Sequence, residues 1–251
     1  MLCFCWEGCR MIASHKLRNR DIYLNKLIAF QDTEPIKVVT GIRRCGKSSL
    51  LKLMAAHLRE NGVNDEQIIE INFESYEFIK MTSDDLYQYV KERSLPSKRM
   101  YLFFDELQRM AGWENTINAF RVDLDCDIYI TGSNAKLLSG ELATYLGGRY
   151  VEFVIYPFSF GEFMELYRTI TPDASIQQCF QKYLLAGGMP YLANLRYADA
   201  PSKQYLHDLF NSVQLKDIVK RNKIRDVDLL ERIMAYVMAN VGKTFTASSL
   251  A

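Results

Sequence analysis

Residues 40–49 read Thr40-Gly41-Ile42-Arg43-Arg44-Cys45-Gly46-Lys47-Ser48-Ser49, which fits the pattern G-x-x-x-x-G-K-[S/T]. Apolar residues with strand character precede the motif at Ile36, Val38 and Val39, and leucines at helical spacing follow it. The motif therefore lies between a strand and a helix, which is the context that a phosphate-binding loop requires. The alternative interpretation is a glycine turn that carries Lys-Ser by chance.

The predicted loop would hold a nucleotide mainly through its backbone. The two glycines permit a path that turns successive N–H groups inward, and the next helix adds free N–H groups and a partial positive charge. Lys47 is expected to reach the β- and γ-phosphates, and Ser48 to hold Mg²⁺. Because the sequence lacks the guanine-reading motif N-K-x-D, we expect ATP and not GTP. The predicted nucleotide-binding residues are Gly41, Ile42, Arg43, Arg44, Cys45, Gly46, Lys47, Ser48 and Ser49.

Three side chains of the loop have two interpretations each. Arg43 and Arg44 either touch phosphate or point outward, and outward is the commoner orientation at these variable positions. Cys45 lies near a helix N-terminus, which would lower the pKa of its thiol and make oxidation a way to block nucleotide binding. The simpler interpretation of Cys45 is a small residue that fits.

A pair of acids follows the apolar run Met100–Phe104. An unbroken apolar run of this length predicts a buried parallel strand, and the carboxyl end of such a strand meets the ligand. Asp105 is expected to hold Mg²⁺ through its water shell, and Glu106 to polarise the attacking water. The alternative is a carboxylate pair that caps the next helix.

Two later positions are candidates for contact with the γ-phosphate. Ser133 and Asn134 follow the predicted strand Ile128–Ile130 and either sense the γ-phosphate or form an ordinary turn. Arg149 lies on a Gly-Gly turn before the last predicted strand. It is either an arginine finger that reaches the nucleotide of a neighbouring subunit, or a solvated loop residue.

The order of elements predicts an α/β fold. Strands alternate with helices up to Pro157, which indicates a parallel sheet with helices on both faces, and Ser83 is the expected N-cap of the helix that runs to Arg93. After Pro157 only helical patterns follow. We therefore place a domain boundary near residue 170, with Thr171-Pro172-Asp173 as the hinge.

The composition is that of an ordinary soluble globular protein. The 251 residues are 49% apolar and 24% charged, and the net charge of +1 provides no global field toward nucleic acid or membrane. No apolar run reaches the roughly 20 residues of a membrane helix, and residues 1–10 lack the pattern of a secretory signal. The default expectation is a cytoplasmic protein without membrane contact.

Two local clusters have a functional and a simpler interpretation. Cys3, Cys5 and Cys9 form C-x-C-x₃-C, but no second group of ligand spacing follows, so a ragged leader before Met11 is favoured over a metal or redox cluster. A basic stretch later in the chain would suit a nucleic-acid backbone, although interspersed aspartates favour a solvated helix face. Its members are Lys216, Lys220, Arg221, Lys223 and Arg225.

The series of motifs resembles a family of prokaryotic AAA-type ATPases whose C-terminal part is a domain of unknown function. The residues that carry this resemblance are 40–48, Phe104-Asp105-Glu106-Leu107-Gln108, 130–135, Gly148-Arg149, 156–163, Gly187-Gly188-Met189-Pro190 and Asp217-Ile218. The resemblance implies a P-loop NTPase sheet in which the strand before Ser133 lies between the phosphate-loop strand and the Asp-Glu strand. It also implies Mg-ATP, a first sensor at Ser133 or Asn134, and an arginine finger at Arg149.

Members of this family usually continue through a winged-helix-like segment and a nuclease-like tail. We accordingly predict a leader over 1–10, a P-loop ATPase domain over 11–170, a helical domain over 171–228 and the start of a winged-helix-like segment over 229–251. The sequence ends at Ala251, before a recognition helix and wing, which indicates a fragment or a truncated reading frame and places DNA binding in doubt.

Three functional hypotheses follow. The first is an ATPase whose conformational cycle acts on an unknown protein partner, in a homo-oligomer if Arg149 acts between subunits. The second is a switch or binding module that holds ATP and hydrolyses it slowly. The third and weakest is a DNA-associated motor, for which turnover would be stimulated by DNA and depend steeply on salt.

Overall fold

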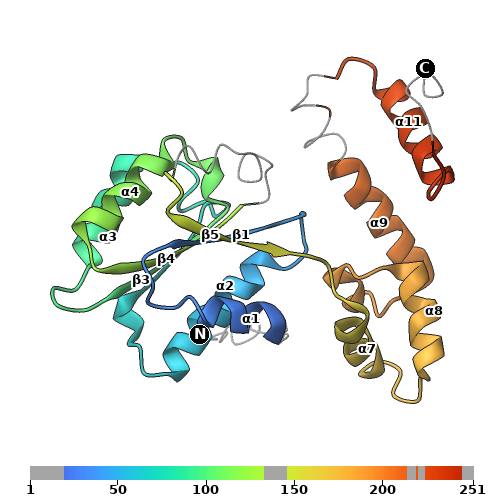
Figure 1. Ribbon diagram of the computed structural model, residues 1–251, viewed down its shortest axis with the longest axis horizontal. Coiled ribbons are helices and arrows are strands. Elements are labelled where there is room, and N and C mark those ends of the chain that lie inside the picture. The colour runs from blue at the N-terminus through green and yellow to red at the C-terminus, as the bar shows by residue number, and fades with distance from the viewer. Residues whose placement is uncertain (1–19, 133–145, 214–218, 220–223, 245–251) are drawn as a thin grey trace, which may run out of the picture.

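The computed structural model describes residues 20–132, 146–213, 219 and 224–244 (Figure 1). The predicted leader, Ser133 and Asn134 of the predicted sensor, and most of the basic stretch lie outside these residues. Within them, no helix is both long enough and apolar enough to cross a membrane.

A five-stranded parallel sheet forms the first half of the molecule, with the strand order β2-β3-β4-β1-β5. This order confirms the predicted P-loop type of sheet, because β4 lies between β1, which leads into the phosphate loop, and β3, which ends in the acids. The strands are β1 (Ile36–Gly41), β2 (Ile68–Asn72), β3 (Met100–Asp105), β4 (Cys126–Thr131) and β5 (Tyr150–Ile155).

Helices cover both faces of this sheet (Figure 1). Alternate residues of each strand point to opposite faces, so that Leu102 and Phe104 of β3 join one core cluster while Tyr101 and Phe103 join the other. Both faces are buried, which explains why β3 reads as an unbroken apolar run. One face packs against α3 (Ser83–Arg93) and α4 (Trp113–Asp123), and the other against α1 (Asp21–Ile28) and α2 (Lys47–Glu60).

The predicted cap of α3 is wrong by one residue. The N-cap is Thr82, whose hydroxyl accepts from the Asp85 N–H (3.2 Å) while the Asp85 carboxylate accepts from the Thr82 N–H (3.0 Å). This reciprocal capping box needs an acid three residues after the cap. Thr82 has one at that spacing, so it takes the role that we assigned to Ser83.

The second half of the chain is helical. Its described helices are α7 (Phe160–Arg168), α8 (Ile176–Ala186), α9 (Asp199–Val213) and α11 (Val227–Ala239), with the short 3₁₀ helix η3 (Pro190–Ala193) between α8 and α9. Among the described residues of the first half, η1 (Asp65–Gln67) and η2 (Leu107–Arg109) are also 3₁₀ helices. Figure 1 shows α7, α8 and α9 as a group beside the sheet. We refer to α7–α9, with η3, as the helical unit.

The core of the helical unit shows where it begins. Phe163 of α7 is fully buried with Leu192 and Tyr197, in a cluster that contains no strand residue. The linker before α7 is fastened to the same unit, because the Phe158 N–H donates to the Gly188 carbonyl (2.7 Å). We therefore propose that α7 and the linker at residues 156–158 pack with the later helices, although they precede the predicted boundary near residue 170.

One ion pair is fully buried at the amino end of the sheet. Lys37 at the start of β1 and Asp127 at the start of β4 both have 0% exposed side chains, and 2.5 Å separates Nζ from Oδ1. The other carboxylate oxygen of Asp127 accepts from the Tyr129 hydroxyl (2.9 Å) and the Asp32 N–H (2.8 Å). Burial lowers the pKa of Lys37 although the neighbouring carboxylate opposes this shift. The pair ties β1 to β4 and to the turn before β1.

Candidate nucleotide site

The phosphate loop connects β1 to α2 along a path that only glycine permits at its two ends. Gly41 has a φ of 142°, and a Cβ there would lie 2.3 Å from the Ile155 carbonyl oxygen of β5. Gly46 has a φ of 105° and is the N-cap of α2. Both φ angles lie in the region that side chains rarely adopt. The two glycines of the motif are therefore explained by backbone path and, at Gly41, by close approach to β5.

Lys47 begins α2 and bends back over the loop. Its side chain is 5% exposed, and Nζ donates to the carbonyl oxygens of Gly41 (3.1 Å) and Ile42 (3.0 Å). The ammonium group is thus held within the loop, next to the free N–H groups of the α2 N-terminus. This combination is an anion-binding arrangement.

The two acids at the end of β3 are held by a threonine on the neighbouring strand. The Thr131 hydroxyl, at the end of β4, donates to Oδ1 of Asp105 and accepts from the Glu106 N–H (3.0 Å). Glu106 adopts the left-handed conformation (φ 55°), so the chain turns sharply after Asp105. A strained residue of this kind costs of order 1–3 kcal/mol and is typical of functional sites.

The capping alternative for these acids is not supported. Glu106 precedes η2, but its side chain makes no capping hydrogen bond, and its Oε2 instead accepts from the Gln108 side chain (2.5 Å). From the sequence, Ser133 and Asn134 were candidates for contact with the γ-phosphate, and Thr131 had no predicted role. A hydroxyl at the last residue of the strand next to β3 was the available signal.

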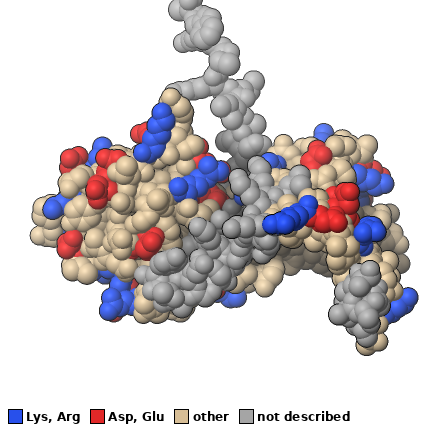
Figure 2. Space-filling view, turned by 90° about the horizontal axis from the view of Figure 1, so that it is seen from above, with Lys and Arg blue, Asp and Glu red and all other residues tan. Residues whose placement is uncertain are grey.

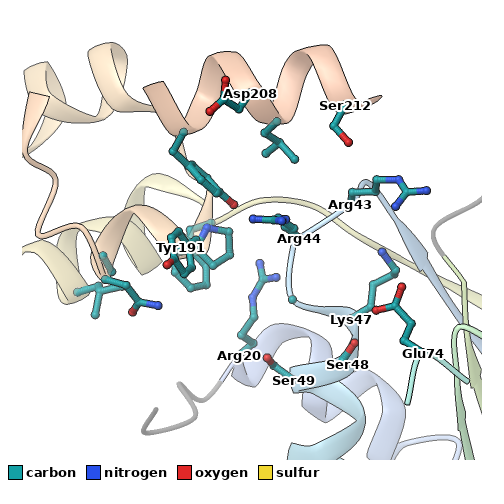
Figure 3. A pocket seen from close by; sticks show the side chains of 18 of the residues that line it. Arg20, Arg43, Arg44, Lys47, Ser48, Ser49, Glu74, Tyr191, Asp208 and Ser212 are labelled. Atoms are coloured by element: carbon teal, nitrogen blue, oxygen red, sulfur yellow. The ribbon is translucent and has the colours of Figure 1, made fainter. Parts of the chain in front are cut away.

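A cavity of about 970 Å³ lies between the phosphate loop and the helical unit (Figure 3). Lys47, Ser48 and Glu106 line it on the side of the sheet. Tyr191 and Asp208 line it on the side of the helical unit. The volume lies at the upper end of the range for small-molecule sites.

The two arginines of the loop both line this cavity. Arg44 is exposed, as the outward interpretation expected, yet its guanidinium lies 5.6 Å from the centre of the Tyr205 ring of α9. Figure 3 shows Arg44 directed at the helical unit, across the cavity from Asp208. Arg44 thus faces the helical unit and not open solvent alone.

The pKa expectation for Cys45 is wrong. The side chain is fully buried between the loop and β5, and this burial raises the pKa of the thiol above its ordinary value. The positive charges of Lys47 and Arg20 act in the opposite direction but are the smaller effect. Cys45 therefore remains a neutral thiol, which favours its interpretation as a small residue that fits.

Arg20 is a site residue that the sequence analysis missed. It directly precedes α1, is 3% exposed, and donates to a carbonyl of the phosphate loop and to the Glu162 carboxylate of α7. Glu162 lies 142 positions further along the chain. No local sequence pattern around an arginine that precedes a helix predicts a contact with so distant a glutamate.

The comparisons with known proteins agree with this geometry. The family model for the AAA domain matches residues 33–164, and that for a domain of unknown function (DUF8612) matches residues 177–251. The chain belongs to the AAA domain family. This confirms the resemblance to AAA-type ATPases with a C-terminal domain of unknown function, and the AAA domain here has the fold of the nucleotide-binding P-loop ATPases.

The proteins similar to this AAA protein include two relatives and two solved structures described here in turn. An uncharacterized protein of Haemophilus influenzae is 38% identical over 94% of the chain and 59% of its own length. The uncharacterized protein MJ1544 of Methanocaldococcus jannaschii is 31% identical over 90% of the chain and 51% of its own length. The chain thus spans less than two thirds of these relatives.

The Walker-type ATPase PABY2304 of Pyrococcus abyssi superposes with a TM-score of 0.61 at 21% identity, covering 92% of this chain and 86% of that one. Caenorhabditis elegans PCH-2 superposes with a TM-score of 0.51 at 14% identity, covering 76% and 65%. At these identities both structures support the fold alone.

Arg149 of this AAA domain lies far from its own phosphate loop. It is exposed and precedes β5, and its carbonyl accepts from the Ile36 N–H (3.0 Å) at the start of β1. The loop follows the other end of β1, roughly 16 Å away at 3.3 Å per residue. Arg149 is therefore remote from the nucleotide site of its own chain.

Proposed function

We propose that this AAA protein binds Mg-ATP on the phosphate loop and hydrolyses its terminal phosphate. The observation that carries the proposal is that Lys47 and Glu106 line the same cavity, one from the loop and one from the end of β3. A positive charge on the phosphates and a carboxylate for the attacking water are the two parts that hydrolysis requires.

The residues divide these tasks. The N–H groups of the loop and the Lys47 ammonium bind the β- and γ-phosphates. Ser48 and Asp105 supply hard oxygen donors, which is the ligand type that Mg²⁺ prefers, and the bound cation would neutralise phosphate charge. Glu106 orients the water and accepts its proton while the water oxygen bonds to the γ-phosphorus and the bond from that phosphorus to the ADP oxygen breaks. Thr131 and Gln108 hold Glu106 in place.

The described residues on the face in Figure 2 carry charges of both signs. Figure 2 shows Lys and Arg interspersed with Asp and Glu over the described residues of this face, with no extended field of one sign. Non-specific binding to DNA relies on such a positive field. An ATP-dependent switch that hydrolyses slowly would use the same site, and the rate of turnover separates it from an active ATPase.

Replacing Glu106 by glutamine tests the catalytic proposal. The amide keeps the size of the side chain but cannot accept a proton, so we expect steady-state phosphate release to fall at least about a hundredfold while affinity for Mg-ATP is retained. Glu92→Gln on the exposed surface of α3 is the matched control and should leave both unchanged. A Glu106→Gln variant with normal turnover contradicts the role of Glu106.

We also propose that Arg149 acts in trans as an arginine finger, in a homo-oligomer. Its exposed position, remote from its own phosphate loop, supports a role toward a neighbour. Arg149→Ala should lower turnover about a thousandfold at protein concentrations where subunits associate, and change little at high dilution. Rates measured across a dilution series decide this. An equal loss at every concentration argues against action between subunits.

A further inference from the structure

Arg20 is almost completely buried, and its guanidinium donates hydrogen bonds to three separate parts of the chain. Nε and Nη2 donate to the two carboxylate oxygens of Glu162 (2.7 and 3.2 Å). Nη1 donates to the carbonyl oxygens of Cys45 (3.1 Å) in the phosphate loop and Tyr156 (3.0 Å) in the linker. A buried guanidinium without partners is costly, so these three parts are held in one arrangement by one side chain.

Two aromatic rings enclose the same guanidinium. Its central carbon lies 4.4 Å from the centre of the Tyr23 ring of α1 and 5.1 Å from that of Phe158 in the linker. Such contacts strengthen when the cation is removed from water. Arg20 therefore has its position fixed both by hydrogen bonds and by ring contacts.

The contact with Cys45 sets the orientation of a peptide group in the loop. In a planar trans peptide the carbonyl of one residue and the N–H of the next point in opposite directions. Because Arg20 holds the Cys45 carbonyl, the Gly46 N–H is directed to the opposite side of that peptide. Gly46 lines the cavity, and its N–H is among the loop groups available to a phosphate.

The contact with Glu162 reaches the first turn of α7. Glu162 closes a capping box with Ser159, since its Oε2 accepts from the Ser159 N–H (2.8 Å) while the Ser159 hydroxyl accepts from the Glu162 N–H (3.4 Å). The same carboxylate thus starts α7 and binds Arg20. Any movement of α7 away from the loop breaks a bidentate ion pair that is 3% exposed on one side and 19% on the other.

We propose that Arg20 is a positioning residue that couples the phosphate loop to the helical unit through Glu162. The proposal rests on the proposed binding of ATP at the loop. An ATP molecule that needs the Gly46 N–H favours the loop conformation that Arg20 holds, and thereby favours α7 docked on the loop. Coupling of this kind is reciprocal, so docking of α7 raises the affinity for ATP by the same factor.

The test compares four conservative variants of the full chain. Arg20→Lys keeps the charge but loses the fork of donors, and Glu162→Gln keeps the size of the side chain but removes the acceptor charge. Arg59→Lys and Glu70→Gln are the matched controls, because they alter an exposed arginine–glutamate pair with an Nη2–Oε1 distance of 2.7 Å. Should Arg20→Lys fail to fold, Glu162→Gln still tests the coupling.

The first readout is the affinity for a fluorescent N-methylanthraniloyl derivative of ATP. We expect about tenfold weaker binding for Arg20→Lys and for Glu162→Gln, and a change within about twofold for the two controls. The second readout is amide hydrogen exchange in the first turn of α7. Nucleotide should slow this exchange in the wild type and should not slow it in Glu162→Gln, whereas a purely structural role alters the exchange equally with and without nucleotide.

The outcomes separate the two proposals. A wild-type chain that does not bind the ATP derivative overturns the proposed function and the coupling together. A wild-type chain that binds it, with affinities of Arg20→Lys and Glu162→Gln within about twofold of the wild type, overturns the coupling alone. The coupling alone is also overturned if nucleotide does not change the rate of hydrogen exchange in α7 of the wild type.

Discussion

Replacing Lys47 by alanine is expected to weaken the binding of Mg-ATP at least about a hundredfold. The Lys47 ammonium lies inside the phosphate loop and donates to the carbonyls of Gly41 and Ile42. A bound phosphate would take over these donors, and charge-assisted hydrogen bonds of this type are the strong ones. The loss of two such bonds, at about 1.5–3 kcal/mol each, corresponds to roughly a hundredfold or more in affinity.

Equilibrium titration with an ATP derivative measures this effect. Lys52→Ala is the matched control, because Lys52 lies on the same helix and is exposed to solvent. The Lys52→Ala variant should bind the ATP derivative as tightly as the wild type does. A Lys47→Ala variant that binds as tightly as Lys52→Ala contradicts the assignment of the loop as the phosphate site.

The second large effect is expected in stability and not in activity. Asp127→Asn should lower the free energy of unfolding by about 3 kcal/mol, because it leaves the fully buried Lys37 without a countercharge. Asparagine also replaces one acceptor oxygen of Asp127 by a donor, so the loss combines the missing charge with a broken hydrogen bond. Urea unfolding followed by circular dichroism measures the difference.

Two comparisons sharpen this prediction. Asp199→Asn removes the exposed acid of a surface pair with Lys182, in which 2.5 Å separates Nζ from Oδ1, and should leave the free energy of unfolding nearly unchanged. The double variant Lys37→Met with Asp127→Leu removes both buried charges but leaves the Tyr129 hydroxyl and the Asp32 N–H without their acceptor, so it should recover only part of the lost stability. Equal effects of Asp127→Asn and Asp199→Asn contradict the account of the buried pair.

Local patterns were sufficient to predict most of the fold. The motif at Gly41–Ser49 has fixed spacing, and the apolar run before Asp105 marks a strand buried on both faces. These signals lie within a few residues of each other, and the parallel sheet follows from their alternation with helices. The same reasoning placed Asp105 and Glu106 at the carboxyl edge of the sheet, where the structure has them.

Contacts between distant parts of the chain could not be predicted from the sequence. Arg20 meets Glu162 across 142 positions, and Lys37 meets Asp127 across 90. A basic residue within an apolar strand gives no indication of its partner. The role of Thr131 could not be predicted for another reason. Threonine is an ordinary strand residue, and its role here depends on the neighbouring strand.

The domain boundary illustrates a similar limit. Thr171-Pro172-Asp173 has the composition of a hinge, but whether a helix belongs to the unit before or after it depends on packing. The burial of Phe163 with Leu192 and Tyr197 places α7 with the later helices.

The central claim is that ATP bound on the loop is hydrolysed with the help of Glu106. A single-turnover experiment tests this most directly, with protein in excess over radiolabelled Mg-ATP and acid quenching at successive times. The account predicts that the wild type converts the bound ATP to ADP and phosphate, while Glu106→Gln retains it as ATP for at least about a hundred times longer. Bound ATP that persists equally in both proteins contradicts the claim and assigns the chain to the slow switches.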